Sequence, residues 1–387
     1  QDLLEKEQEE VLGRSRYERG DTIGIYRNGY EPGRYKTAEG IMKVEKPQIR
    51  GLSSPYRSTI LEKLKRTSEQ LRKLVIEMYT CGMSNLDIEE SLEKALGGFI
   101  ISKSSVSDIT EELFKEYEQF KNRDLSGFDC IYLFIDTVYE PLRRYGSRTG
   151  VMCCWGYLTD GSKVLIDMTT ANSESYSACL DFLRGLLKRG LRTPLTITTD
   201  GAKGLIKAVE AIWPKSKRIR CWFHKMQNLE AKVPKYAWED FKSLILDVRD
   251  GADIETSKER IKAIIKKYKN QFPEACRCLK DDIDASLNHL IVPYRHRQYV
   301  RTTNLIERTF VETRRRTKTI PHLWDEKSLL KLVFGTLIRV SDRWAQPSFS
   351  TMEEEIIKNL RNKILGENNK VVIKRKKRTR RSHTRAA

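Results

Sequence analysis

Two apolar runs near the middle of the chain each end at an aspartate. Residues 131–135 lead into Asp136, and residues 195–199 lead into Asp200, which Gly201 follows. Short apolar runs rich in β-branched and aromatic residues predict strands buried in a sheet. A carboxylate that ends such a strand needs partners, because burying an unpaired charge is costly. The runs therefore predict a fold whose sheet presents acids at the ends of its strands.

The pattern from residue 128 onward predicts an α/β fold. The expected strands are at residues 130–137, 151–158, 163–169, 194–200 and 217–223, and the expected helices are at 173–189 and 202–213. Three strands joined by short turns, followed by alternating helix and strand, are typical of an RNase H-like core. The first and fourth strands of that core lie side by side, so Asp136 and Asp200 would be neighbours.

A helical stretch delays the last part of this core. Residues 225–300 contain amphipathic segments near 236–249 and 257–270 and predict an all-helical insertion. A helix at 303–318 then completes the core and carries Glu307 near its start. This helix would bring Glu307 to the two aspartates, where three hard oxygen ligands suit Mg²⁺ or Mn²⁺.

Two of these acids also have ordinary structural explanations. Asp200 suits an N-cap at a strand-to-helix turn, and residues 304–307 suit a capping box that ends at Glu307. Asp136 is the hardest of the three to explain in this way, because a carboxylate that follows an apolar strand needs partners. From the residues alone, one shared metal site and three separate structural roles both stay open.

The N-terminal third predicts a DNA-binding region. After a helix in the first twenty residues, the Asn28-Gly29 pair predicts a turn, and a strand is possible at 40–46. Helical periodicity then covers residues 58–120, where Leu71, Leu74, Val75 and Met78 share one face.

Two more helices are expected in this region, at 86–96 and at 105–120. Lys103 and Ser104 precede the last of them and are candidate DNA contacts. Three short helices with a glycine-containing turn are typical of a helix-turn-helix-like unit, and a plain helical bundle is the alternative.

These patterns together predict six segments. They are an N-terminal helix with a small β element (1–57), a helix-turn-helix-like domain (58–125), the first part of an RNase H-like core (126–228), an all-helical insertion (229–301), the final helices of the core (302–347), and a C-terminal helix with a basic tail (348–387).

Charge predicts a polyanionic partner. The chain carries 72 Lys and Arg against 53 Asp and Glu, a net charge of +19. Nine Lys and Arg and no acids lie between residues 370 and 387, so the remaining residues still carry +10. Nucleic acid is the simplest partner for a body and a tail that are both basic. The tail also resembles a nuclear localisation signal, although a DNA-binding arm suits a bacterial-type protein better.

From about residue 20 to 345 the sequence resembles the IS256-like, Mutator-type family of DDE transposases. The resemblance rests on ordered motifs: residues 26–30, Asp136, Asp200-Gly201, a Cys-x-x-His element from Cys221 to His224, an Asn-x-x-Glu-Arg element from Asn304 to Arg308, and the arginine run at 314–316. Thr137 departs from the pattern, since a glycine is common there.

The resemblance implies that Asp136, Asp200 and Glu307 are the catalytic, metal-binding acids of a transposase. Two Mg²⁺ or Mn²⁺ ions per active site would support strand cleavage and then strand transfer. The implied partners are double-stranded DNA (terminal inverted repeats and target DNA) and other copies of the chain, as a dimer or larger assembly. A membrane partner is not expected, and the protein would act in the bacterial cytoplasm on nucleoid DNA.

Two other functions stay open as alternatives. One is a domesticated DNA-binding regulator that lost catalysis, and the other is a nuclease or resolvase on the same fold. The presence of all three acids argues against the first, and strand-transfer products would exclude the second.

Cys221, His224 and Asn304 are expected beside the active site. Cys221 and His224 could form half of a zinc site, with Cys276, Cys278 and His289 as possible further ligands. Their spacing matches no recognisable finger, so a structural or DNA-positioning role is preferred. With eight scattered cysteines and no small disulfide framework, reduced thiols in an intracellular protein are expected.

A basic cluster on and beyond the Glu307 helix predicts phosphate contacts. It comprises Arg308, Arg314, Arg315, Arg316 and Lys318. Core packing is expected for Trp222, Trp324 and Trp344, with base stacking as the alternative. Four other acids could be mistaken for catalytic ones, namely Glu140, Asp160, Asp167 and Glu312.

Overall fold

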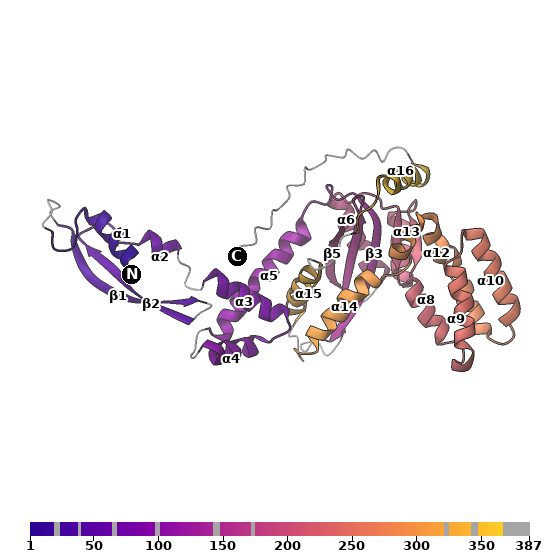
Figure 1. Ribbon diagram of the computed structural model, residues 1–387, viewed down its shortest axis with the longest axis horizontal. Helices are drawn as coiled ribbons and strands as arrows, with labels where there is room; N and C mark the ends of the chain where they lie inside the picture. The colour runs from indigo at the N-terminus through magenta and orange to yellow at the C-terminus, as the bar shows by residue number, and fades with distance from the viewer. Residues whose placement is uncertain are drawn as a thin grey trace, which may run out of the picture. The chain divides into compact units, whose positions relative to one another are not determined.

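The computed structural model describes most of the chain, which forms two compact units (Figure 1). The described residues are 1–18, 24–37, 40–63, 68–96, 101–141, 148–171, 175–320, 325–341 and 347–366. Trp324, Trp344 and the basic tail lie outside them. Unit 1 comprises residues 1–121, 139–149 and 309–342, and unit 2 comprises residues 122–138, 150–308 and 343–387. Among the described helices, none has both the length and the apolar character that a bilayer crossing requires.

Unit 1 begins with a helix packed on a two-stranded antiparallel sheet. Helix α1 (Asp2–Leu12) contacts β2 (Gly40–Arg50), which pairs with β1 (Tyr26–Thr37). The turn predicted at Asn28-Gly29 is wrong, because these residues lie inside β1 where the register shifts between Arg27 and Tyr30. Gly29 adopts a φ of +73°, so the pair forms a bulge. The two strands stay paired as far as Thr37 and Gly40.

Most of the rest of unit 1 is helical. It includes α2 (Thr59–Lys63), α3 (Glu69–Thr80), α4 (Asn85–Leu96), α5 (Lys103–Asn122) and α15 (Glu326–Ser341). Leu71 and Val75 are buried as expected, whereas Leu74 is 39% exposed. The buried face of α3 turns instead to Tyr79 and Thr80, because α15 packs there and Gly335 approaches the Thr80 methyl group.

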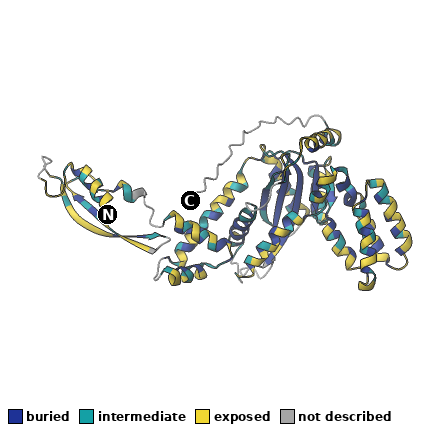
Figure 2. Ribbon diagram, in the orientation of Figure 1, coloured by how far each residue is buried: buried dark blue, intermediate teal, exposed yellow. Residues whose placement is uncertain are grey.

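Unit 2 is built on a five-stranded mixed sheet with the order β5-β4-β3-β6-β7. The strands are β3 (Cys130–Pro141), β4 (Arg148–Leu158), β5 (Lys163–Ala171), β6 (Thr196–Thr199) and β7 (Lys217–Arg220). Strands β3 and β6 run parallel with Ile135 opposite Thr199, so the expected pairing of the Asp136 and Asp200 strands is confirmed. Figure 2 shows these strands as buried, in contrast to the exposed β1–β2 pair.

The last predicted strand is too long. Strand β7 ends at Arg220, and helix α8 (Trp222–Glu230) begins where strand was expected up to residue 223. The N–H of Cys221 still donates to the Thr199 carbonyl at 2.9 Å, but the N–H of Trp222 donates to the Arg301 carbonyl. The chain leaves the sheet because the Trp222 side chain is buried among the helices that follow.

Alternate residues of the sheet contact different layers. Leu133, Ile135 and Ile197 pack against α6 (Tyr176–Lys188) and α7 (Lys203–Ile212) in one buried cluster. On the opposite face the Tyr132 hydroxyl lies 2.9 Å from His296 Nδ1, and the Thr198 hydroxyl donates to the Val300 carbonyl at 2.7 Å. Side chains two residues apart share a face. Asp136 and Asp200 therefore face the segment around residues 296–300, away from α6 and α7.

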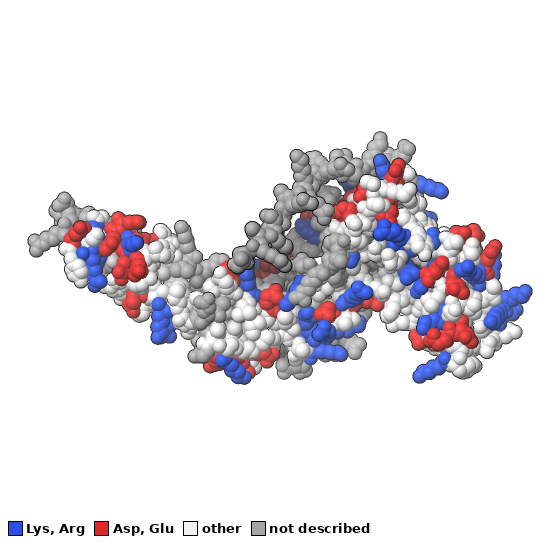
Figure 3. Space-filling view, in the orientation of Figure 1, with Lys and Arg blue, Asp and Glu red and all other residues white. Residues whose placement is uncertain are grey.

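The residues from the end of β7 to about residue 301 form a helical group with its own hydrophobic core. It comprises α8, α9 (Lys235–Arg249), α10 (Ile254–Tyr268), α11 (Pro273–Lys280), α12 (Ile283–Leu287), the short 3₁₀ helix η1 (Asn288–Ile291) and α13 (Tyr294–Val300). Its apolar side chains, including Trp222, Phe241 and Ile261, form one buried cluster. Lys, Arg, Asp and Glu are interspersed over the face of these helices that Figure 3 shows. The expected helical character of this stretch is confirmed.

Two further helices follow. Helix α14 (Asn304–Thr317) carries Glu307 in its first turn, as expected. Helix α16 (Thr351–Leu365) begins with a capping box between Ser350 and Glu353. Its Arg361 is bonded to Asp129 at 2.7 Å, just before β3 begins.

Candidate active site

Asp136 lies in β3, next to the end of β6 that carries Asp200. Only 6% of Asp136 is exposed. Its Oδ1 accepts the Thr137 N–H at 2.8 Å, and its carboxylate also accepts a hydrogen bond from the Thr303 side chain. Thr303 directly precedes α14. The buried carboxylate on the sheet is thereby connected to the helix that carries Glu307.

Thr303 is a completely buried hub between three elements. Its N–H donates to the Cys221 Sγ atom at 3.3 Å, and its hydroxyl lies 3.4 Å from the same sulfur. The hydroxyl also lies 3.4 Å from Glu307 Oε1. Cys221 therefore fixes the start of α14, which supports the structural role expected for it beside the acids.

His224 lies between the acids, one helical turn beyond Cys221. Its Nε2 is 3.7 Å from Glu307 Oε1, and its charge favours the ionised form of Asp136. Its Nδ1 is buried and has no hydrogen-bond partner within the described residues. His224 can therefore orient Glu307 from one ring nitrogen while the other is available to a further group.

Asp200 keeps a local bond as well as its place beside Asp136. Its Oδ1 accepts the Ala202 N–H at 3.0 Å, which forms a local turn. The N-cap role considered for Asp200 is wrong, because Ala202 is the N-cap of α7. Its negative charge nevertheless acts on Asp136 and raises the pKa of that carboxyl. The structural role of Asp200 and its proximity to Asp136 therefore coexist.

Burial raises the pKa of Asp136 to about 7, and the neighbouring charge of Asp200 adds to this rise. His224 and the hydrogen bonds from Thr137 and Thr303 act in the opposite direction. A carboxylate buried beside a second carboxylate needs more cationic compensation than His224 supplies, because its pKa is still raised to about 7. A divalent cation would supply it, so the donor chemistry here fits Mg²⁺ or Mn²⁺.

A different set of atoms lies closest together. Within the part of the chain that the structure describes, Cys221, His224 and Glu307 form the one group of three possible ligand atoms lying within 4.8 Å of one another. The three predicted acids do not meet that limit as a set. Burial raises the pKa of the Cys221 thiol, which disfavours the thiolate that zinc requires. Asn304 is exposed at the start of α14, beside this group.

The wider zinc set does not assemble. His289 is buried and bonded to the Ser286 and Arg249 carbonyls, and Cys276 lies in the core of the inserted helices. Trp222 is 1% exposed and its indole N–H donates to the Ser286 carbonyl at 2.7 Å. The expected core packing of Trp222 is confirmed.

Arg220 is a cation at the site that sequence analysis missed. Its guanidinium lies directly over Gly201, where a Cβ would fall 1.0 Å from Nη1. Gly201 has a φ of +95°, so both its backbone conformation and this close approach require glycine. The Nη1 atom is buried without a hydrogen-bond partner among the described residues. Only the three-dimensional pairing of β6 with β7 brings this arginine beside Asp200-Gly201.

The predicted DNA contacts differ in how open they are. Arg308, Arg314 and Lys318 are exposed, as are Lys103 and Ser104 in the first turn of α5. Arg315 is exposed but pairs with Glu312 at 3.0 Å. Arg316 is held inside unit 1, because its Nε donates to the Thr80 carbonyl at 2.9 Å and its Nη1 bonds Glu312.

The four acids that could be mistaken for catalytic ones have structural surroundings of their own. Asp160 accepts the Ser162 N–H in the turn between β4 and β5. Asp167 is buried and pairs with Arg189 at 2.5 Å. Glu312 pairs with Arg315 and Arg316, and Glu140 is buried in unit 1.

Comparison with known proteins fixes the family. The sequence pattern described as "Transposase, Mutator family" matches residues 1–347. The chain belongs to the Mutator family of transposases. It is 32% identical over 268 residues to the transposase for insertion sequence element IS6120 of Mycolicibacterium smegmatis, covering 69% of this chain and 83% of that one. It is 28% identical over 351 residues to the transposase for IS256 in transposon Tn4001 of Staphylococcus aureus, covering 89% of each.

A solved structure is also similar to part of this transposase-family chain. It is a simian T-cell lymphotropic virus intasome in complex with a PP2A regulatory subunit, with 14% identity over 59% of this chain and 73% of that one. At a TM-score of 0.19, nothing about the fold follows from this likeness.

Proposed function

We propose that the chain is a DDE transposase that binds the terminal inverted repeats of its insertion sequence and catalyses metal-dependent DNA cleavage and strand transfer. The observation that carries the proposal is the buried Asp136, which faces Asp200 on a neighbouring parallel strand and is linked through Thr303 and His224 to Glu307. Family membership supports the same activity. The sheet order β5-β4-β3-β6-β7 supports an RNase H-like core.

Asp136, Asp200 and Glu307 would hold two Mg²⁺ or Mn²⁺ ions, which lower the pKa of a water or a DNA 3′-hydroxyl and stabilise the leaving oxygen. Two adjacent ions do not require all three acids within reach of a single ion. Thr303 holds Asp136 and Glu307 in position relative to each other, and His224 orients Glu307. Residues 58–125 would recognise element ends as a helix-turn-helix-like domain, with the segment boundaries expected from the sequence.

The test is an assay on DNA that carries the ends of the element, with a target plasmid present. With Mn²⁺ or Mg²⁺ we expect cleavage at the ends followed by joining to the plasmid, and with EDTA neither product. Tight binding without cleavage would indicate a DNA-binding regulator instead. Hydrolysis without joined products would indicate a nuclease or resolvase.

Metal affinity should fall as the pH falls below about 7. A divalent ion requires the ionised form of Asp136, whose pKa burial raises to about 7. Below that pKa a proton competes with the ion, and affinity should decrease by up to roughly tenfold per pH unit. Titration calorimetry with Mn²⁺ in buffers of different ionisation enthalpy would measure both the affinity and the protons released. An affinity that stays constant from about pH 6 to pH 8 would contradict this role for Asp136.

A further inference from the structure

A pocket in the inserted helices is lined by arginines. Its volume is about 360 Å³, and it lies where the end of α9 meets α13. Arg249, Arg295, Arg297 and Arg301 line it together with Asp250 and Tyr294. We call this set the arginine pocket. All of its members belong to unit 2.

The pocket has more cations than its own carboxylate can neutralise. Asp250 pairs with Arg249 at 2.6 Å and with Arg301 at 2.6 Å. Burial lowers the pKa of Arg301, and the adjacent charge of Arg249 lowers it further. The positive charges are thus crowded even with Asp250 between them, and an anion in the pocket would relieve their repulsion.

The other two arginines add charge without a carboxylate inside the pocket. The guanidinium of Arg297 donates to the carbonyls of Gly251, Ala252 and Leu290 at 3.0–3.1 Å. Arg295 has a side chain that is 71% exposed, and it reaches Glu353 of α16 at 3.6 Å. The Arg297 contacts within the pocket are thus with neutral carbonyls, and Arg295 can swing towards a ligand.

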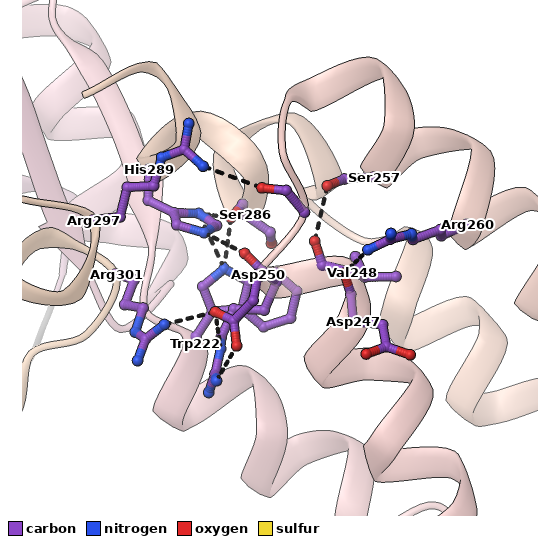
Figure 4. Close-up of polar contacts among 12 residues, drawn as sticks. Trp222, Asp247, Val248, Asp250, Ser257, Arg260, Ser286, His289, Arg297 and Arg301 are labelled. Carbon is purple, nitrogen blue, oxygen red and sulfur yellow. Dashed lines mark hydrogen bonds and ion pairs between the residues drawn. The ribbon is translucent and has the colours of Figure 1, made fainter. Parts of the chain in front are cut away.

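The pocket is held on a rigid base. His289 is 1% exposed, and its Nε2 lies 2.8 Å from the Arg249 carbonyl, while its Nδ1 lies near the Ser286 carbonyl and the Trp222 indole. Burial lowers the pKa of His289 to about 4, so this ring is a neutral support. Figure 4 shows His289 between these partners and the Arg301 side chain reaching Asp250. Preformed geometry lowers the entropy cost of binding.

The backbone links the pocket to the carboxylates. Arg301 accepts the Trp222 N–H through its carbonyl at 2.9 Å. Trp222 follows Cys221, and Arg301 lies two residues before Thr303, the hub that contacts both Asp136 and Glu307. Nucleic acid that reaches the acids would have its flanking backbone close to these arginines.

We propose that the arginine pocket binds a backbone phosphate of DNA whose scissile bond lies at the three acids. The proposal rests on the proposed function in that DNA is the substrate. Guanidinium groups bind phosphate oxygens through paired hydrogen bonds. Such a contact positions the duplex without reading its sequence. The pocket would hold DNA whether or not metal is bound.

The test is the affinity of the full chain for a fluorescein-labelled duplex in EDTA, measured by anisotropy over a range of salt concentrations. The double variant Arg249→Gln/Arg295→Gln should bind at least about tenfold more weakly at low salt. The slope of log affinity against log salt should also fall by up to about two. The matched control is Lys266→Gln/Arg277→Gln, which removes two exposed charges from the inserted helices outside the pocket. It should change both quantities much less.

Equal losses in the two double variants, or an unchanged salt slope in the pocket variant, would overturn the proposal. Thermal melting of both variants excludes unfolding as the cause of a loss. Because EDTA removes the metals, this result is independent of cleavage. Pocket-dependent binding without metal-dependent cleavage would refute the proposed function and leave the pocket assignment standing. Metal-dependent cleavage, together with unaltered DNA binding by the pocket variant, would refute the pocket assignment and leave the proposed function standing.

Discussion

Asp136→Asn should abolish cleavage and strand transfer, lowering the rate by about a thousandfold or more, while the protein still binds element-end DNA. The asparagine has nearly the same shape but cannot supply the negative charge that holds a divalent ion. Its amide oxygen can still accept the Thr137 N–H that Oδ1 accepts in the wild type, so strand β3 should keep its structure. Single-turnover cleavage in Mn²⁺, with binding measured separately, checks both parts.

The same variant should be more stable than the wild type when no metal is present. The pKa of Asp136 lies near 7 in the folded protein, above its ordinary value of 3.8. The folded state thus binds the proton more tightly than the unfolded state, and stability from this group decreases as the pH rises from about 4 to about 7. Above pH 7 the buried charge should cost a few kcal/mol, since each pKa unit corresponds to about 1.4 kcal/mol. Asp136→Asn removes that cost.

Asp160→Asn is the matched control. Asp160 is an exposed acid in the turn between β4 and β5, and its carboxylate accepts hydrogen bonds from nearby Ser162. We expect cleavage to continue at near the wild-type rate, with no stabilisation above pH 7. If Asp136→Asn cleaved DNA as fast as Asp160→Asn, the assignment of Asp136 to the active site would be wrong.

The sequence predicted the framework of the site because the presence and order of strands and helices follow from local patterns. The apolar runs before Asp136 and Asp200 predicted both strands, although β3 continues to Pro141 instead of ending near Asp136. The parallel pairing of β3 with β6 nevertheless places Asp136 beside Asp200. The helical stretch with its own core explains how Glu307 can be 107 residues beyond Asp200 and still reach Thr303 and His224. Periodicity is sufficient for features of this kind.

The features that the sequence could not predict depend on contacts between distant segments. Arg220 reaches Gly201 only because β7 pairs with β6. The end of strand β7 was misplaced because Trp222 is drawn into the core of helices that come later in the chain. The arginine pocket joins residues 249–250 to residues 294–301, and no spacing in the sequence indicates that these charges converge.

Arg189→Leu should destabilise the protein by about 3–5 kcal/mol, the range expected when one partner of a buried ion pair is removed. Arg189 follows helix α6, and its guanidinium bonds Asp167 of β5 at 2.5 Å, with side-chain exposures of 14% and 1%. The leucine would leave the Asp167 carboxylate buried without this partner. Urea unfolding of the wild type and the variant measures the difference. The matched control is Arg184→Leu on α6, whose pair with Asp181 is exposed and 3.9 Å apart, so its loss should cost less than about 1 kcal/mol.

Adding Asp167→Asn to Arg189→Leu should recover part of the lost stability, because it removes a buried charge whose bonded arginine is gone, while the charge of the nearby Arg123 still favours it. Asp167→Asn alone should destabilise, since Arg189 and the nearby Arg123 would then repel each other without a carboxylate between them. Asp136→Asn should instead stabilise the metal-free protein. Both aspartates are buried in strands of one sheet, yet one has an arginine partner within the fold and the other has a second carboxylate as its neighbour. A buried acid whose removal stabilises the metal-free protein is held in place to bind a ligand. Equal destabilisation by Asp136→Asn and Asp167→Asn would contradict this distinction between the two acids.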